Sequence, residues 1–227
     1  MKTISRNGLK YIAIGAMLLD HAAEFYPKTS ILYFCMRFLG RLTMPIMCFF
    51  IAEGYFFTSS KIRYGLRLGI FTLVSQLPYT YFHEGTLLTA KLFTDWNVIF
   101  TLFIGFCVLM VYDKIPNKII RWIVIALLCA GSIIGDWRII TPMWILFFYI
   151  FRDSKKNLLV FGVLAVLEVL SCLPNIINDG QLWQVGVFLV IPLLYLYKGN
   201  SGSKNVFVKW AFYLFYPLHL LVLGLLK

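Results

Sequence analysis

The sequence predicts an all-α integral membrane protein: a polytopic bundle of about nine transmembrane helices forming one domain over residues 1–227. Hydrophobic residues make up 60% of the chain, charged residues make up 14%, and the mean hydropathy is +0.81. Soluble domains are about 45–50% apolar and about 25% charged. Apolar stretches close to the length that crosses a bilayer recur along the whole chain, and the connections are too short to hold a soluble domain.

The apolar stretches predict nine spans in order. The first is expected to be a retained helix rather than a cleaved signal peptide, because it ends in Asp20-His21 and no small-x-small cleavage site follows. The second contains Pro45 and is expected to be kinked or broken. The sixth is the shortest of the nine. The spans cover roughly residues 8–26, 31–57, 64–82, 87–112, 116–135, 139–151, 157–174, 181–197 and 206–226.

Lysine and arginine concentrate in alternate connections. This positive-inside pattern predicts a cytoplasmic N-terminus, an outer C-terminus and a multi-pass location in a bacterial inner or plasma membrane, with the lipid bilayer as a partner. The net charge of +11 is then explained by the excess of lysine and arginine in cytoplasmic connections, which argues against a nucleic-acid partner. The inner clusters are Lys2, Arg6 and Lys10; Lys61, Arg63 and Arg67; Lys114, Lys118 and Arg121; Arg152, Lys155 and Lys156; Lys198, Lys204 and Lys209.

The five cysteines are scattered and lack CxxC or other metal-type spacing. We interpret them as small buried hydrophobic residues, and we expect no metal.

Ionisable side chains inside apolar stretches are costly, so each is a hypothesis for a functional site. Lys10 and His21 lie eleven residues apart, which is about three helical turns and about 16 Å, so they share one helix face. Arg37 and Arg41 are four apart and also share a face. We expect an outer polar site and, toward the cytoplasm, Lys10 and Glu53. The outer site would bring together His21, Arg37, Arg41, Asn97 and His219.

These residue types suggest transfer chemistry. A histidine at depth is a candidate general base that deprotonates an amine or hydroxyl acceptor. Asp20 points about 100° away from His21 around the helix, where it would orient another histidine or stabilise an arginine. Arg37 and Arg41 suit an anionic ligand or a developing oxyanion, because guanidinium groups bind carboxylate and phosphate with two hydrogen bonds.

Structural explanations stand beside each of these assignments. His21 is also compatible with a hydrogen bond to a neighbouring helix, and the two arginines with ion pairs to Asp20 or Asp95. Lys10 is also compatible with snorkelling to the inner surface. Glu53 is compatible with pairing to Lys61 or Arg63.

Five motifs in chain order resemble the TraX family. Together they cover nearly the whole sequence and are more specific than any one of them. They are Gly8–His21, Arg37–Gly54, Arg67–Pro78, Asn97–Leu102 and Lys209–Leu220. Gln76 departs from the acidic residue expected in many relatives.

The resemblance implies an acetyltransferase. The named member of the family acetylates the N-terminal amine of conjugative pilin, and the family is similar to type 3 acyltransferases and heparan-glucosaminide N-acetyltransferase. Those enzymes often carry an Arg- or Lys-x10-His signature on the first helix, which Lys10 and His21 match. The resemblance implies that His21 is catalytic and that Lys10 belongs to the path of the donor, acetyl-CoA. It gives Arg37, Arg41, Glu53, Asn97 and His219 no individual roles, and related enzymes dimerise in some cases, so a homodimer is one option.

We therefore predict an acyl-CoA-dependent acyltransferase, with Asp20 beside His21 in the catalytic site and Arg37, Arg41, Asn97, His219 and Glu53 binding substrate. It would move an acetyl group from cytosolic acetyl-CoA to an amine or hydroxyl acceptor at the outer side, with His21 as base. The acceptor, whether a peptide N-terminus, a glycan or a small molecule, is left open. One alternative is a small-molecule or ion transporter. Another is a non-catalytic subunit of a pilus or envelope assembly machine.

Overall fold

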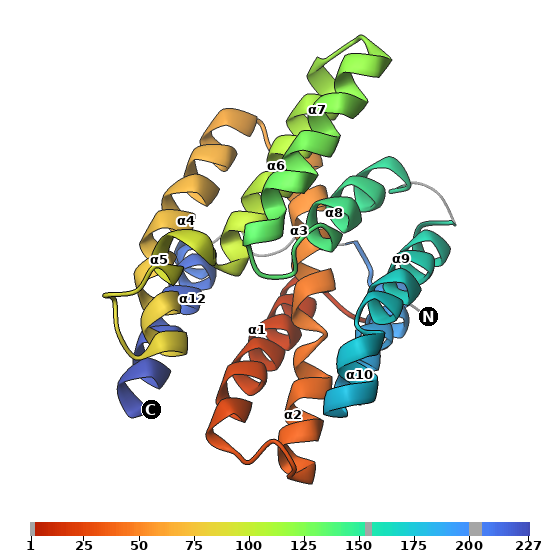
Figure 1. The fold of residues 1–227 in the computed structure, drawn as a ribbon. Coiled ribbons are helices and arrows are strands. Elements are labelled where there is room, and N and C mark those ends of the chain that lie inside the picture. The colour runs from red at the N-terminus through yellow and green to blue at the C-terminus, as the bar shows by residue number, and fades with distance from the viewer. Residues whose placement is uncertain (1–2, 153–155, 200–205) are drawn as a thin grey trace. The chain divides into compact units, whose positions relative to one another are not determined.

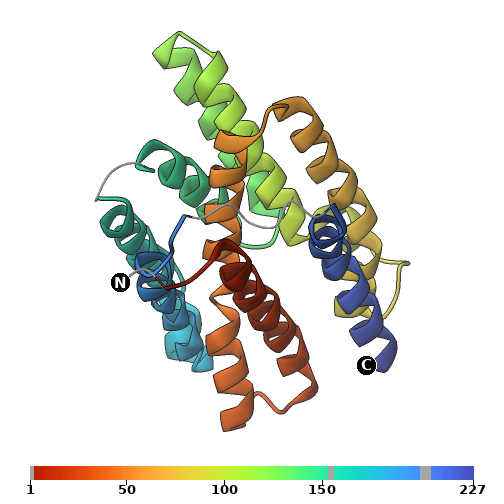
Figure 2. The same cartoon turned by 180° about the vertical axis from the view of Figure 1, so that it is seen from behind.

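The computed structural model describes residues 3–152, 156–199 and 206–227, and no residue in these ranges belongs to a β-strand (Figures 1 and 2). Lys2, Lys155 and Lys204 of the predicted basic clusters lie outside them. The chain divides into two compact units, each made of two segments. Unit 1 contains Met1–Met47 and Lys155–Phe215, and unit 2 contains Cys48–Ser154 and Tyr216–Lys227. The expectation of a single domain stays a prediction.

In unit 1, α1 and α2 begin at serine caps, and η3 packs against α2 through a glycine. Ser5 and Ser30 accept hydrogen bonds from the backbone N–H groups of Gly8 and Tyr33, which satisfies donors at the first turns of α1 and α2. A side chain at Gly186 would overlap the carbonyl of Phe38, so this glycine lets η3 approach α2. The elements are α1 (Arg6–Ala22), η1 (Ala23–Phe25), α2 (Ile31–Gly40), α9 (Asn157–Ser171), α10 (Leu173–Asp179), η3 (Leu182–Leu189) and α11 (Val190–Tyr195).

In unit 2, α6 packs against α4, α7 and α8. Gly105 permits the close approach of α8, because a side chain there would overlap Ile145. Two of the three points at which the chain passes from one unit to the other lie within helices, one in α3 and one in α12. The elements are α3 (Thr43–Phe57), α4 (Lys61–Glu84), α5 (Lys91–Thr94), α6 (Val98–Lys114), α7 (Lys118–Gly131), η2 (Ser132–Ile134), α8 (Ile140–Ile150) and α12 (Val206–Leu226).

Each of the nine predicted stretches contains a helix, and two departures have clear causes. The expected interruption near Pro45 is confirmed, since Arg41 and Leu42 form a turn between α2 and α3 and proline lacks the N–H that would bond to Arg41. The predicted start of the fourth span at residue 87 is wrong. Its helix, α6, begins at Val98, because the Asn97 side chain accepts the N–H of Ile99 and caps the helix there.

Nine membrane crossings are not confirmed by the helix lengths. Among the described residues, one helical stretch is long and apolar enough to cross a bilayer: Ile31–Phe57, with 27 residues and a mean hydropathy of 1.5. The pair Asn157–Ser171 and Leu173–Asp179, bent by 49°, makes a second if it counts as one span. The number of crossings therefore stays a prediction.

The α4 helix places several polar side chains, together with apolar ones, on its buried face and large apolar side chains on its exposed face. Its buried face includes Thr72, Ser75, Gln76 and Thr80, whereas its exposed face carries large apolar side chains. Exposed apolar positions recur at helical spacing on that outer face: Ile62, Leu66, Ile70, Leu73 and Leu77. Polar groups in the interior and apolar groups at the surface are what a helix bordered by lipid requires.

Two buried amides join α4 to the segment that leads into α6. The Gln76 Oε1 atom accepts hydrogen bonds from the backbone N and the side-chain Nδ2 of Asn97, at 3.1 and 2.8 Å. The Gln76 Nε2 atom donates to the carbonyls of Leu92 and Asp95, at 3.1 and 2.8 Å, and Asn97 Nδ2 also donates to the carbonyl of Thr72 at 2.8 Å. Gln76 is 5% exposed and Asn97 is fully buried. Satisfied buried amides of this kind fix the register between two helices.

The same pair explains why glutamine occupies position 76. A carboxylate accepts hydrogen bonds but donates none, so it would leave the carbonyls of Leu92 and Asp95 without their donor. Gln76→Glu is expected to lower the free energy of unfolding in detergent by about 2–4 kcal/mol at pH 8. The loss should be smaller at pH 4, where a protonated carboxyl donates one bond. The partly exposed Gln184 provides the control, and Gln184→Glu should change stability by less than about 0.5 kcal/mol. Equal losses in the two variants would contradict this assignment.

Candidate functional site

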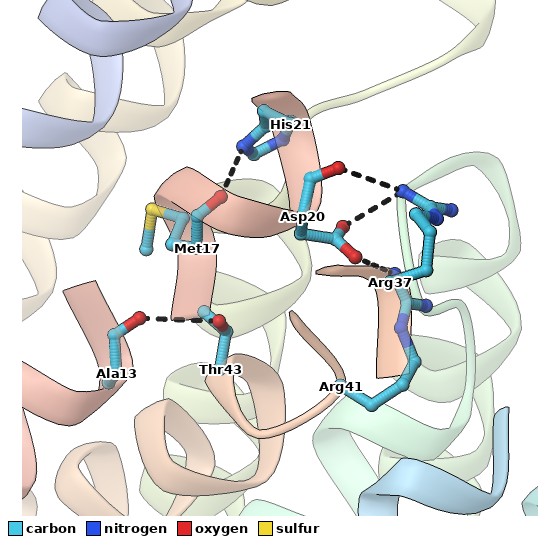
Figure 3. Close-up of polar contacts among 7 residues, drawn as sticks. All are labelled: Ala13, Met17, Asp20, His21, Arg37, Arg41 and Thr43. Carbon is cyan, nitrogen blue, oxygen red and sulfur yellow. Dashed lines mark hydrogen bonds and ion pairs between the residues drawn. The ribbon is translucent and has the colours of Figure 1, made fainter. Parts of the chain in front are cut away.

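The carboxylate of Asp20 lies between two arginines in unit 1 (Figure 3). Asp20 Oδ1 accepts a hydrogen bond from Arg41 Nη2 at 2.6 Å, and Oδ2 accepts one from Arg37 Nη1 at 3.1 Å. Arg37 Nη1 also lies 3.4 Å from the backbone carbonyl of Asp20, near the C-terminal end of α1. The side chains of Asp20 and Arg41 are 16% and 8% exposed. We call these three residues the Asp20 clamp, because they tie the end of α1 to the end of α2.

The backbone between the arginines makes room for this carboxylate. A Cβ atom built at Gly40 would lie 2.5 Å from Asp20 Cβ and 2.7 Å from its Cγ, closer than such atoms pack. Gly40 is the last residue of α2, and Arg41 follows it directly. The spacing Arg37-x-x-Gly40-Arg41 therefore places two guanidinium groups on either side of a gap that the carboxylate of Asp20 enters. Close by, the Thr43 hydroxyl donates to the carbonyl of Ala13 at 3.3 Å and holds the start of α3 against α1.

His21 follows Asp20 in the last turn of α1 and has a defined ring orientation. Its Nδ1 atom lies 3.1 Å from the backbone carbonyl of Met17. A carbonyl only accepts hydrogen bonds, so this contact places the proton of a neutral imidazole on Nδ1 and the lone pair on Nε2. A neutral histidine in this tautomer is a competent general base at Nε2. His83 makes the same contact with the carbonyl of Tyr79 at 3.0 Å, so the geometry alone does not define a site.

The clamp assigns Asp20 one of the roles weighed from the sequence. Its carboxylate contacts arginines, which makes Asp20 a positioning residue for the helix end that bears His21. The two ion pairs expected as a structural alternative for Arg37 and Arg41 are formed with Asp20. Arg37 and Arg41 each carry a positive charge close to the residue that precedes His21. Such a charge stabilises an anion or a developing oxyanion.

The other predicted site residues fall into both units. Lys10 lies on α1 with His21, as expected. In unit 2, His219 is 7% exposed with its ring 5.7 Å from that of Tyr216, and Glu53 is 8% exposed on α3. Asn97 serves as a helix cap and as the partner of Gln76. Convergence of the two sets into one site stays a prediction, because each unit is described by itself.

A polar cluster centred on Asp113 was missed in the sequence analysis. The Asp113 carboxylate accepts hydrogen bonds from Lys61 Nζ at 2.7 Å, from the Tyr55 hydroxyl at 2.9 Å and from the Tyr149 hydroxyl at 3.0 Å. Pairing with Lys61 or Arg63 was one structural alternative for Glu53, and the ion pair of Lys61 is with Asp113. Burial of Asp113 favours the neutral acid, but the hydrogen bonds from Lys61, Tyr55 and Tyr149 outweigh it and lower the pKa of this carboxyl. An aspartate directly after an apolar run, in a chain with ten acidic residues, was the available signal.

No group of three or more histidine, cysteine, aspartate or glutamate side chains in the described part of the chain is arranged to hold a metal ion. The five cysteines are free thiols.

The clamp predicts a strong effect of a single methyl group. Gly40→Ala should displace the carboxylate of Asp20 from the two arginines and lower the free energy of unfolding in detergent by about 2–4 kcal/mol. Gly15 provides a matched control within α1, because a Cβ there meets no atom within 4 Å. Gly15→Ala should leave stability unchanged or raise it by up to about 1 kcal/mol. Chemical unfolding followed by circular dichroism measures both, and a Gly40 variant as stable as the Gly15 variant would refute the clamp.

Similarity to known proteins extends over nearly the full length of the chain. The chain is 30% identical over 228 residues to a protein of Dichelobacter nodosus named probable fimbrial assembly protein FimC, serogroup H1, covering 95% of this chain and 92% of that one. It is 32% identical over 111 residues to the uncharacterised protein RP591 of Rickettsia prowazekii (strain Madrid E), covering 47% of this chain and 37% of that protein. No solved structure matches it. The TraX protein family matches residues 5–227, and the chain therefore belongs to the TraX family.

Proposed function

We propose that this protein acts in pilus or related envelope assembly from within the cell membrane. The observation that carries the proposal is the full-length similarity to a protein named as a probable fimbrial assembly protein. Because the match spans 95% of this chain, it concerns the whole protein rather than one shared segment.

The surface of the helices supports a membrane location. Leu66, Ile70, Leu73 and Leu77 on α4 are each more than half exposed, while Gln76 beside them is buried. Exposed apolar side chains at helical spacing also occur on α7, α9 and α12. In water, apolar surfaces of this extent mark interfaces or cause aggregation, and in a bilayer they contact lipid tails. The long apolar stretch Ile31–Phe57 is consistent with this location.

A second candidate is acyl transfer to a component of the assembled structure. The observation that favours it is the hydrogen bond between His21 Nδ1 and the carbonyl of Met17, which assigns the proton of a neutral ring to Nδ1, close to the guanidinium groups of the Asp20 clamp. The acyl donor would be acetyl-CoA, with Lys10 on the donor path and Arg37 or Arg41 beside the reacting carbonyl. The two candidates are compatible, because an assembly factor can act by modifying a subunit.

The chemical step would proceed in two stages. Nε2 of His21 takes a proton from the amine or hydroxyl acceptor as that atom attacks the thioester carbonyl, and the carbonyl oxygen becomes an oxyanion. A guanidinium group of Arg37 or Arg41 stabilises this oxyanion. Collapse breaks the carbon–sulfur bond, and the imidazolium returns its proton to the departing thiolate. The products are an acylated acceptor and free CoA.

Inside-out membrane vesicles test acyl transfer without knowledge of the acceptor. Radiolabelled acetyl-CoA is supplied at the exposed cytosolic face, and label incorporated into membrane protein or glycan is counted. His21→Ala should lower incorporation by about 100-fold or more. His83→Ala is the matched control, since His83 makes the same contact with a backbone carbonyl outside the predicted spans, and it should keep at least half the activity. Equal labelling by the wild type and the His21 variant, at equal protein level, would exclude His21 as the base.

A complementation experiment separates the two candidates. In a host whose own gene is deleted, we expect loss of surface pili or of a comparable envelope structure, and restoration by the wild-type gene. Failure of a folded His21→Ala variant to restore assembly supports an enzymatic role, whereas full restoration supports a non-catalytic subunit. A deletion that leaves pili and envelope unchanged would contradict the assembly role itself. Electron microscopy of cells and immunoblotting of the protein provide the readouts.

A further inference from the structure

One end of unit 2 carries a concentrated positive charge. At this end α4 and α7 begin and α6 ends, and Figure 1 shows α6 and α7 joined there. Six cations and one carboxylate, that of Asp113, lie on these three helices at this end. We call the six cations the basic end: Lys61, Arg63, Arg67, Lys114, Lys118 and Arg121.

The cations at the starts of α4 and α7 oppose the helix dipoles, whereas Lys114 lies favourably in the last turn of α6. Both α4 and α7 begin with lysine, have an arginine two or three residues later, and have no acidic residue in the first turn. The N-terminal end of a helix carries partial positive charge, so cations there are unfavourable and anions are favourable. Capping by Ser60 and by Asn117 satisfies backbone N–H groups but adds no negative charge. The basic end therefore has two positive helix termini and side chains of the same sign.

The chain neutralises little of this charge. Asp113 pairs with Lys61 at 2.7 Å. Within the described residues, Arg63, Arg67, Lys114, Lys118 and Arg121 form no ion pair with a carboxylate. Arg67 and Arg121 instead lie over aromatic rings, 5.6 Å from the centroid of Tyr64 and 5.2 Å from that of Tyr112. Rings orient a guanidinium group without cancelling its charge, which leaves it able to bind an anion.

Apolar side chains continue directly from the cations along the same two helices. On α7, Ile119, Ile123 and Leu127 are exposed beyond Lys118. On α4, Ile62, Leu66 and Ile70 are exposed beyond Lys61, before, between and after the two arginines. A row of exposed apolar groups that starts at a cluster of cations matches an amphiphile, with an anionic head and hydrocarbon tails. A soluble phosphate compound would leave the apolar rows uncovered.

We propose that the basic end binds the phosphate headgroup of an acidic phospholipid, with its acyl chains against the apolar rows of α4 and α7. The proposal rests on the membrane location and is independent of acyl transfer. Arginine and lysine near a membrane surface each strengthen binding of anionic lipid, and guanidinium groups bind phosphate with two hydrogen bonds. Bound lipid would also relieve the repulsion between the cations and the helix dipoles, so it should stabilise unit 2.

The test uses the full-length protein in a neutral detergent. Phosphatidylglycerol and phosphatidylcholine with identical acyl chains are titrated in parallel, and lipid binding and the thermal midpoint of unfolding are measured. We expect phosphatidylglycerol to bind more tightly, to raise the midpoint, and to lose its advantage at high salt. The triple variant Arg63→Gln, Lys118→Gln and Arg121→Gln should bind phosphatidylglycerol about 100-fold more weakly, at about fivefold per cation.

A matched triple variant removes three cations from outside this end: Lys28→Gln, Lys91→Gln and Arg138→Gln. It should bind phosphatidylglycerol within about twofold of the wild type, and an equal loss would overturn the proposal by showing that only net charge matters. Failure of the wild type to prefer phosphatidylglycerol over phosphatidylcholine would also overturn it.

Inorganic pyrophosphate is the third arm of the experiment. Displacement of lipid by pyrophosphate at equal concentration would reassign the site to a soluble phosphate. If the first triple variant does not fold, enrichment of acidic lipid in wild-type protein after purification decides the question, and no enrichment would refute the proposal.

Discussion

The carboxylate of Asp20 is the constraint on which the candidate site depends. It lies between Arg37 and Arg41, is mostly buried, and each of its oxygens accepts a hydrogen bond from a different arginine. Removing one partner from a buried ion pair leaves an uncompensated charge, which is costly. The arrangement therefore requires both arginines, the aspartate and a residue without a side chain at position 40. It brings the ends of α1 and α2 together and positions His21, whose ring is held by the carbonyl of Met17. A base with a defined tautomer close to guanidinium groups is the minimum that acyl transfer would require.

In unit 2, a pair of neutral amides links α4 to the start of α6, whereas in unit 1 an ion-paired carboxylate links α1 to α2. Gln76 and Asn97 satisfy each other and three backbone carbonyls in a buried position, so this pair carries no net charge. It holds α4 with its polar face inward and its apolar face outward. The same helix begins at the basic end and is anchored there by Lys61 to Asp113. One helix thus combines a charged end, a polar interior face and an apolar outer face, which is the pattern expected of a helix at a membrane.

The sequence predicts the helical stretches well, because long apolar runs report directly on them. It predicts the interruption of the second stretch, because proline has a local and unavoidable effect. It does not distinguish the partners of polar residues. Asp20 was compatible with orienting a histidine or binding an arginine, and Lys61 was compatible with Glu53, until three-dimensional neighbours were known. Asn97 was assigned to substrate from its depth, whereas its neighbour in space, Gln76, comes from another helix. Gly40 could not be interpreted at all, since its importance lies in an atom of α1 that occupies the space beside it.

A double-mutant cycle between Asp20 and Arg41 tests the central claim most directly. The free energies of unfolding of the wild type, Asp20→Asn, Arg41→Gln and the double variant are measured in the same detergent. The clamp predicts that the two changes are not additive, with a coupling energy of about 1.5 kcal/mol or more, because either change alone already removes the ion pair between the two side chains. If the loss in the double variant equals the sum of the two single losses to within about 0.5 kcal/mol, the two side chains do not interact in the folded protein. That result would contradict the account.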